Sequence, residues 1–459
     1  MALMSSGINA SIAVTRFGLG AKPGEIADAA ADPKGWLIAQ IEASGAPGPL
    51  DEMARPFPSS VNRFADFLAY REAVKAAGAD MDKRKAAREA LNAETRAEFL
   101  ARARMAATTG RPFAERWALF WSNHFTVSTR KGEELAALAP SFEREAIRPN
   151  VFGRFEDLLL ASSRHPAMLF YLDQAQSIGP NSRAGLRRSG GLNENLGREI
   201  LELHTVGVDA GYSQGDVTEF ARALTGWSVG RPNQPGETAG AFLYRPNVHE
   251  PGGRQVFGRR YGEGEEEQAR HVLGDLAVHP KTADHIAKKL AVHFVADRPD
   301  AALVARLSDS FQKSRGDLSA LARTLITAPE AWTEPQGKMK TPYELIVSGY
   351  RAVGQAPRDA GREIDGPLTL LGQKPLSPIQ PNGWSERAEE WAAPDALIKR
   401  LQWAQGFAGA FAGSDDPVQT AASALGERLR PETDNALRHA ESRKEALALL
   451  LMSPEFQRR

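Results

Sequence analysis

Apolar residues recur at helical spacing through most of the chain, and this periodicity limits the fold more than any other feature of the sequence. Helix starts are marked as well: Asp32 and Pro33 form an N-cap with proline at the first helical position, and Thr341 with Glu344 forms a capping box. At other places an apolar helical pattern ends, a short break follows, and a new helix begins with proline. These breaks fall at Pro166, Pro280, Pro329 and Pro454. The pattern predicts a mainly α protein, a multi-helix globular array.

We expect residues 1–459 to form a single large helical unit with three local departures. Residues 79–108 are rich in Ala, Arg, Lys and Glu, with opposite charges four residues apart, and predict an exposed charged helix or arm. Residues 177–192 are rich in Gly, Ser and Arg and predict a mobile loop. Residues 227–262 contain short aromatic and β-branched runs between Gly, Pro and Asn, which indicates a small β-hairpin or irregular insertion.

Composition excludes several classes of protein. The chain has 57 basic and 57 acidic residues, so it lacks the basic surplus that binds a phosphate backbone, and we expect no nucleic-acid partner. The chain contains no cysteine, so disulfides and thiolate metal sites are excluded. No run of about 18 apolar residues occurs, so we expect no membrane span. The amino end has no basic segment followed by an apolar core, which favours a cytoplasmic location.

The segment ERWALFWSNHFTVSTR holds the first candidate site. Trp117, Phe120, Trp121 and His124 fall on one face of a helix. One interpretation is an aromatic core stripe that ends in a hydrogen-bonded histidine. The other is that Asn123 and His124, where the helix should fray, supply a substrate-binding amide and a partly desolvated base or ligand.

The segment NENLGREILELHT is the most distinctive polar stretch of the chain. On a regular helix Leu196, Ile200 and Leu203 form an apolar stripe, and Glu199 and His204 lie half-buried beside it. Because burial of an unpaired carboxylate is costly, these groups belong either to a buried ion-pair network or to a site for acid–base chemistry. The candidate catalytic residues are His124, Glu199, Glu202 and His204. The candidate substrate-binding residues are Asn123, Asn193, Asn195, Arg198, Glu219, Arg222 and Trp227.

A third polar segment, NVHEPGGRQVFGRR, places His249 and Glu250 before a Pro-Gly-Gly turn. A histidine and a carboxylate on a turn can bind a cation, or they can cap the turn, so His249 and Glu250 are candidate metal ligands. His279, directly before Pro280, is expected to be a structural cap. Motifs for zinc, nucleotides, calcium and a nucleophilic serine elbow are missing, and the cofactor, if there is one, is unknown.

Several of these segments together resemble the bacterial family called "domain of unknown function 1800". The resemblance is carried by TRFGLGAKPGE, ERWALFWSNHFTVS, NENLGREILELHT, VHPKTADHIAKKL, KMKTPYELIVSGYRAVG and PNGWSERAEEW, in the expected order over nearly the whole chain. It implies a mainly helical protein, often exported in other members and often encoded beside a sulfatase-like exported protein. It therefore favours a periplasmic location, and it implies no reaction.

We expect the polar segments to converge on one cleft. The enzyme hypothesis is hydrolysis or transfer on a sugar or another polar polymer, with Glu199 or Glu202 as acid or base and His124 or His204 as its partner. Two alternatives stay open. One is a non-enzymatic binding or assembly partner of the sulfatase-like protein, and the other is a metal- or haem-dependent oxidant that uses His124 and His204.

Overall fold

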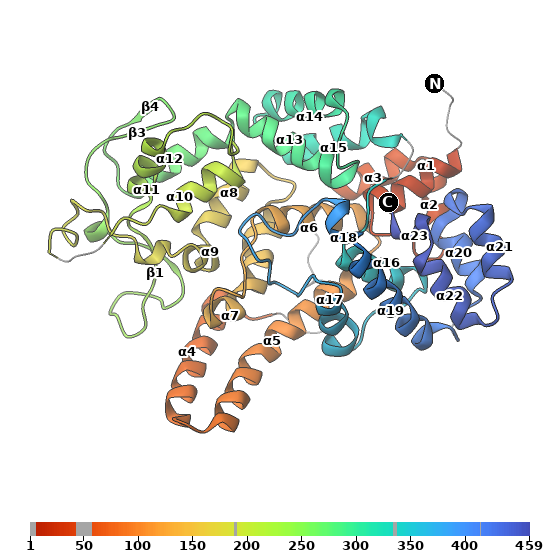
Figure 1. The fold of residues 1–459 in the computed structure, drawn as a ribbon. Coiled ribbons are helices and arrows are strands. Elements are labelled where there is room, and N and C mark those ends of the chain that lie inside the picture. Colours follow the sequence, from red (N-terminus) through yellow and green to blue (C-terminus); the bar gives the residue numbers. More distant parts are fainter. Residues whose placement is uncertain (1–5, 43–56, 188–190, 334–336, 414) are drawn as a thin grey trace.

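The computed structural model describes residues 6–42, 57–187, 191–333, 337–413 and 415–459 (Figure 1). The fold is mainly α, as predicted, and in these ranges the strands are confined to two small antiparallel pairs. Within the same ranges, no helix combines the length and the apolar character that crossing a membrane requires.

Helices follow one another with short connections along most of the chain. The helices of the first half are α1 (Ser6–Ile12), α2 (Glu25–Ala30), α3 (Pro33–Glu42), α4 (Ser60–Ala77), α5 (Met81–Thr108), α6 (Pro112–His124), α7 (Glu133–Phe142), α8 (Phe155–Arg164), α9 (Pro166–Tyr171), α10 (Asn195–Glu199) and α11 (Gln214–Leu224). The helices of the second half are α12 (Glu266–Ala277), α13 (Pro280–Phe294), α14 (Ala301–Lys313), α15 (Leu318–Thr327), α16 (Pro342–Ala352), α17 (Gly366–Leu370), α18 (Ala388–Trp391), α19 (Pro394–Phe411), α20 (Pro417–Leu425), α21 (Pro431–Arg438), α22 (Arg443–Met452) and α23 (Pro454–Gln457).

The predicted breaks between a helix and a proline are confirmed. Proline begins α9, α13 and α23, and a 3-10 turn begins at Pro329. Proline suits this position because the first turn of a helix does not use its amide hydrogen. The residue before the proline caps three of these helices: side-chain atoms of His165, His279 and Ser453 accept hydrogen bonds from backbone amides two or three residues further on. The prediction for His279 is therefore confirmed.

Two clusters of buried hydrophobic side chains form the interior. The larger core lies among α6–α9 and α11–α15. The second core lies between the carboxyl half of α5 and helices α16, α19, α20, α21 and α22 (Figure 1). Leu376 packs against both cores. The two cores therefore meet along a seam, and the charged residues of the candidate site lie on that seam.

The predicted insertion contains two short hairpins. β1 (Trp227–Val229) pairs with β2 (Phe242–Tyr244), and β3 (Arg254–Val256) pairs with β4 (Arg259–Tyr261), both antiparallel. Trp227 is almost fully buried and its ring meets the Phe242 ring at 90° with 5.6 Å between centroids. The insertion thus packs onto the larger core through its aromatic residues.

Helices α4 and α5 form an antiparallel pair that projects from the body of the molecule (Figure 1). Only the first half of α5, which begins at Met81, is exposed, because its charged residues have little to bury. The second half, with Phe99, Ala103 and Ala106, is buried in the second core. The arm predicted for residues 79–108 is therefore an arm in its first half and a core helix in its second.

The predicted Gly/Ser/Arg loop packs against the insertion where the structure describes it. Gly179 donates a backbone hydrogen bond to Val248 (2.9 Å), and Ala184 donates one to Asn247 (2.9 Å). Residues 188–190 of this loop lie outside the described residues. The mobility of residues 177–192 stays a prediction.

Candidate functional site

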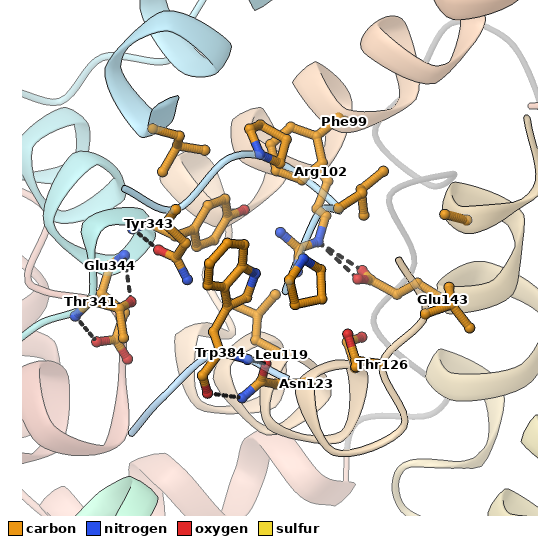
Figure 2. Close-up of a pocket in the computed structure, with 18 of the residues that line it drawn as sticks. Phe99, Arg102, Leu119, Asn123, Thr126, Glu143, Thr341, Tyr343, Glu344 and Trp384 are labelled. Carbon is orange, nitrogen blue, oxygen red and sulfur yellow. Dashed lines mark hydrogen bonds and ion pairs between the residues drawn. The ribbon is translucent and has the colours of Figure 1, made fainter. Parts of the chain in front are cut away.

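A pocket opens on the seam between the two cores (Figure 2). Its cavity volume is about 130 Å³, below the roughly 300–1,000 Å³ of sites for drug-sized molecules, so it suits only a small ligand or one unit of a larger one. Helices α5, α6, α7, α13 and α16 supply its walls, together with the chain between α17 and α18. The charged or ionisable side chains in its lining are Arg102, Arg116, Glu143, His293, Tyr343, Glu344 and Glu386.

The segment of residues 373–387, which we call the strap, crosses the pocket without forming a helix or a strand. Backbone and hydroxyl groups at the end of α6 hold its first part. Ser128 Oγ donates to the Pro378 carbonyl (2.7 Å), and the Thr129 amide donates to the Leu376 carbonyl (2.9 Å). The strap is therefore a fixed wall of the pocket, although it has no regular secondary structure.

Asn123 holds the second part of the strap. Its side-chain nitrogen donates to the Trp384 carbonyl (2.9 Å), and its side-chain oxygen accepts from the Trp384 amide (2.7 Å). Gly383 has a φ of +82°, and a Cβ there would lie 2.5 Å from the Asn123 carbonyl oxygen, so this approach requires glycine. Asn123 thus lines the pocket, as a substrate-binding residue would, and also anchors the strap next to Glu386.

Glu386 and His293 form a buried pair in the pocket wall. His293 Nδ1 lies 2.8 Å from Glu386 Oε1, and because a carboxylate only accepts, Nδ1 carries the hydrogen. His293 Nε2 and Glu386 Oε2 are buried and have no hydrogen-bond partner among the described residues. Lys338 and Asp297 anchor the strap beyond Glu386: the Lys338 ammonium bonds to the Glu386 carbonyl and to Asp297 Oδ1. The pair is therefore fixed on both sides.

The electrostatics of the pair set its protonation. Burial lowers the pKa of His293 to about 4, although Glu386 acts in the opposite direction. Burial raises the pKa of Glu386, but His293, Lys338 and Arg459 outweigh that effect and bring it to about 2. At neutral pH the carboxylate is therefore ionised and the imidazole is neutral, and His293 Nε2 presents its lone pair.

Two arginine–glutamate pairs stiffen the other walls. Arg102 Nε lies 2.9 Å from Glu143 Oε2, and the Arg102 guanidinium lies 4.7 Å from the centroid of the Tyr343 ring. Burial raises the pKa of Glu143, but Arg102 and Arg148 outweigh it and lower the pKa to about 2. Arg116 bonds to Glu344 across the seam at 2.7 Å. These ion pairs join α5 to the turn that follows α7, and α6 to α16, so they fix the pocket where the two cores meet.

The predicted pair of His124 and His204 does form, but it lies on another face of α6 and is not in the lining of the pocket. Their ring centroids are 6.0 Å apart, and His124 Nε2 lies 3.1 Å from the His204 carbonyl oxygen. Burial, with smaller effects of Lys289 and His285, lowers the pKa of His204 to about 3. Both histidines are neutral core residues near neutral pH.

A π-helical turn explains the position of His204. Helix α10 continues as a π-turn over Ile200–His204, and the Thr205 hydroxyl donates to the Ile200 carbonyl (2.6 Å). A π-turn has more residues per turn than an α-helix, so the side chains rotate less from one residue to the next. Leu201 is therefore buried and Leu203 is partly exposed, which makes the predicted apolar stripe wrong at Leu203.

Glu199 and Glu202 are half-buried and are not among the pocket residues. Burial, together with the charge of Glu202, raises the pKa of Glu199 to about 7, although Arg198 acts in the opposite direction. Arg198 pairs with Glu194 (3.1 Å) and with Glu202 (3.5 Å). An acid–base role for Glu199 stays a prediction, and the charged groups that shift its pKa are Glu202 and Arg198 rather than a histidine.

The remaining predicted binding residues hold local structure. Glu219 forms an ion pair with Arg222 and another with Arg254. The Asn193 side-chain oxygen accepts from the Asn195 amide at 2.8 Å, which starts α10. These residues and Trp227 are not in the lining of the pocket, so the predicted convergence brings only Asn123 to it.

His249 and Glu250 lock the insertion onto the loop before α10. Glu250 accepts from the backbone amide (2.7 Å) and from the side chain (2.6 Å) of Asn181, and its own amide donates to Thr225 Oγ1 (2.8 Å). His249 Nδ1 lies 2.8 Å from the Thr225 carbonyl oxygen. Nowhere in the described ranges do three or more His, Asp or Glu side chains gather to hold a metal ion, so the pair lacks a third protein ligand there.

The comparison with protein families matches residues 12–458 to the model described as "Protein of unknown function (DUF1800)". The chain belongs to the DUF1800 family. No curated protein and no solved structure matches it significantly. The pocket of this DUF1800 protein is therefore interpreted from its own residues.

The sequence of this DUF1800 member did not point to His293 or Glu386. His293 lies in a regular amphipathic helix, and Glu386 lies 93 residues further on in a charged segment. The usable signal was PNGWSERAEEW, in which a glycine and a tryptophan interrupt the helical pattern at the place where the strap meets Asn123.

Proposed function

We propose that this protein binds a small polar molecule, or one unit of a polar polymer, in the seam pocket and catalyses its hydrolysis or transfer, with His293 as the general base. The observation that carries the proposal is the buried His293–Glu386 pair, whose outer nitrogen and oxygen have no partner in the described part of the chain. Buried polar atoms without partners are costly in folded proteins, and a catalytic role is one explanation for them where they line a pocket.

In the proposed reaction His293 Nε2 takes the proton from a water molecule or a hydroxyl group as its oxygen attacks the substrate. The same nitrogen returns that proton to the leaving group, so no net proton is consumed. Glu386 keeps the hydrogen on Nδ1 and stabilises the imidazolium that forms, as a carboxylate does for a catalytic histidine. The acid–base pair expected from the sequence, Glu199 or Glu202 with His124 or His204, stays a prediction, and the pocket favours His293 with Glu386.

The test is a screen of chromogenic glycosides, esters and phosphates, with reducing-end release from soluble polysaccharides, using the wild type and His293→Gln. We expect one substrate class to be turned over and the variant to lower kcat by about 100-fold or more, because general-base catalysis contributes that much. The matched control is His165→Gln. His165 also contacts a glutamate, Glu145 (3.2 Å), but its second nitrogen accepts from Ala167, so both nitrogens are used structurally.

His165→Gln should lower the melting temperature and leave kcat unchanged below that temperature. If His293→Gln keeps wild-type kcat on the substrate that the screen identifies, His293 is not the general base. If both histidine variants lose activity in proportion to lost folded protein, the effect is structural and the proposal fails.

A second proposal is that the protein also binds a partner through the α4–α5 hairpin. This hairpin projects from the body of the molecule (Figure 1). Most residues at the start of α5 are exposed, which favours a role in binding a partner. The family resemblance suggests the sulfatase-like product of a neighbouring gene and an exported, periplasmic location. The hairpin carries charges of both signs, such as Lys85 and Glu89, which suits a polar interface more than an apolar one.

The partner proposal predicts that reversing two charges near the hairpin tip, Lys83→Glu with Arg84→Glu, abolishes co-purification of the neighbouring gene product. The control reverses two equally exposed charges elsewhere, Lys313→Glu with Arg315→Glu, and should keep it. Co-purification that survives the hairpin reversal, or that disappears equally in both variants, would exclude the hairpin as the specific surface.

A further inference from the structure

The charged side chains that line the pocket already have partners of opposite charge. Arg102 is paired with Glu143, and Arg116 is paired with Glu344. Further cations lie close to the carboxylates of the lining. The surrounding cations are Arg102, Arg116, Arg148, Lys338 and Arg459, and the surrounding carboxylates are Glu115, Glu143, Asp297, Glu344 and Glu386. Lys289 and Arg400 add further positive charge near Glu386 and Glu344, so each carboxylate of the lining is compensated without a ligand.

Five buried polar atoms of the lining have no hydrogen-bond partner among the described residues. Two of them, Arg116 Nε and Glu386 Oε2, belong to side chains that are already in ion pairs, and the other three are hydroxyl and imidazole atoms. The Ser122 hydroxyl, the Tyr343 hydroxyl and His293 Nε2 are buried and have no hydrogen-bond partner among the described residues. Burial raises the pKa of Tyr343 to about 12, so its hydroxyl keeps its proton and can donate. Hydroxyl groups donate and accept, and the neutral imidazole accepts, so a ligand with several hydroxyl groups would satisfy all three.

Four aromatic rings contribute to the apolar part of the lining, beside leucine, valine, alanine and proline side chains. The rings are those of Phe99, Phe142, Tyr343 and Trp384. Figure 2 shows the Tyr343 and Trp384 rings on the pocket side of α16 and of the strap. Such rings offer flat apolar surfaces beside polar groups, and the carbon–hydrogen faces of a pyranose pack on surfaces of this kind while its hydroxyl groups reach the rim.

We propose that the pocket is a binding site for a neutral saccharide unit, with Ser122, Tyr343 and His293 bonding to its hydroxyl groups and Tyr343 and Trp384 packing against its ring. This inference rests on the proposed function and narrows its substrate class. A phosphorylated or acidic sugar would bring a negative charge close to Glu143 and Glu386. The cations next to these glutamates are already paired with them, so anionic ligands are disfavoured.

The first experiment measures the melting temperature of the full chain with matched neutral and anionic sugars. The neutral probes are glucose, galactose, N-acetylglucosamine and cellobiose, and the anionic ones are glucuronate and glucose 6-phosphate. We expect at least one neutral probe to raise the melting temperature in proportion to its occupancy, and neither anionic probe to do so. An equal rise with the anionic probes, or no rise with any neutral probe, overturns the inference.

The second experiment removes one unpaired hydroxyl at a time. Tyr343→Phe and Ser122→Ala should each weaken binding of the neutral probe by about fivefold, as expected for one lost hydrogen bond. The control is Ser141→Ala, because the buried Ser141 hydroxyl donates to the Leu138 carbonyl (2.8 Å) and is not in the lining. Its affinity should equal that of the wild type, and affinities unchanged in all three variants would contradict the assigned contacts.

The two proposals can fail separately. Turnover of an ester or phosphate that His293→Gln abolishes, without binding of any neutral sugar, would leave the proposed function and remove the saccharide. If a neutral sugar binds but His293→Gln keeps the wild-type kcat, the saccharide site remains and His293 is not the general base.

Discussion

Unfolding at mildly acidic pH is the largest effect that we expect, because several histidines are buried in the neutral form. Burial lowers the pKa of His204 to about 3 and that of His285 and His293 to about 4, with Lys289 or other cations adding to the shift. The unfolded value is about 6.5. His124 shifts in the same direction for the same reason.

The direction in which stability changes with pH follows from which state binds more protons. Above pH 6.5 neither state protonates these groups, so their contribution to stability is complete. Below pH 6.5 the unfolded chain takes up protons that the folded protein does not, and stability falls until the folded pKa values are reached. Each histidine contributes up to about 1.4 kcal/mol per pH unit, so three of them lower the free energy of unfolding by about 7 kcal/mol between pH 6.5 and 4.5. That is comparable to the whole stability of a typical domain, about 5–15 kcal/mol.

Buried histidines and buried carboxylates change the stability in different pH ranges. Glu143 and Glu386, with pKa values lowered to about 2, contribute stability above pH 4.5 that is lost only below it. Glu199 acts the other way, because its pKa is raised to about 7 in the folded state, and its protonation stabilises the protein between pH 7 and 4.5. One glutamate offsets about one histidine, so the net loss remains large.

The measurement is the free energy of unfolding in urea, followed by tryptophan fluorescence, between pH 7.5 and 5. His204→Gln should reduce the slope of this curve by about 1.4 kcal/mol per pH unit, the contribution of one histidine. His439→Gln, which changes an exposed histidine after α21, should leave the slope as it is. A flat curve between pH 7 and 5 would mean that the buried histidines do not control stability.

Local signals in the sequence predicted most of the helical architecture. Proline breaks, and the capping box of Thr341 with Glu344, gave helix starts that the structure confirms, because a cap or a proline acts within three or four residues of the chain. The small β insertion was also predicted, since its turn residues and short aromatic runs are local. The end of the exposed arm was wrong, because burial of Phe99 depends on the distant α16.

The candidate site was only partly predictable. Asn123 was identified because it ends an amphipathic helix in a polar context, and it does line the pocket. The position of His204 depends on a π-turn, which no assumption of a constant 100° per residue can anticipate. The His293–Glu386 pair depends on the path of the strap, which is set by contacts to α6 and has no periodicity of its own.

The second large effect concerns the ion pair between Glu115 in α6 and Arg148 after α7. Both residues are almost fully buried, and two hydrogen bonds join them, at 2.7 and 2.8 Å. Arg148 also bonds to Glu143 at 2.6 Å, and Glu143 in turn holds Arg102 in the pocket wall. Loss of Glu115 would therefore leave a buried guanidinium with one carboxylate fewer, and that remaining carboxylate is shared.

We expect Glu115→Ala to lower the free energy of unfolding by about 3–5 kcal/mol, the usual cost of removing one partner from a buried pair. Glu115→Leu combined with Arg148→Met should recover much of that loss, because no charge then stays buried alone. Asp434→Ala is the control: it breaks the exposed pair with Arg438 (2.8 Å) and should cost less than about 1 kcal/mol.

Urea unfolding of the four proteins at pH 7.5 distinguishes the possible origins of the effect. A double variant less stable than Glu115→Ala would mean that shape and hydrogen bonding at this position matter more than charge. A loss below about 1 kcal/mol in Glu115→Ala would show that water or a neighbouring residue compensates Arg148. If the expected order holds, loss of Glu115 should also loosen Glu143 and Arg102, so the binding of any ligand to the seam pocket should weaken in Glu115→Ala and stay unchanged in Asp434→Ala.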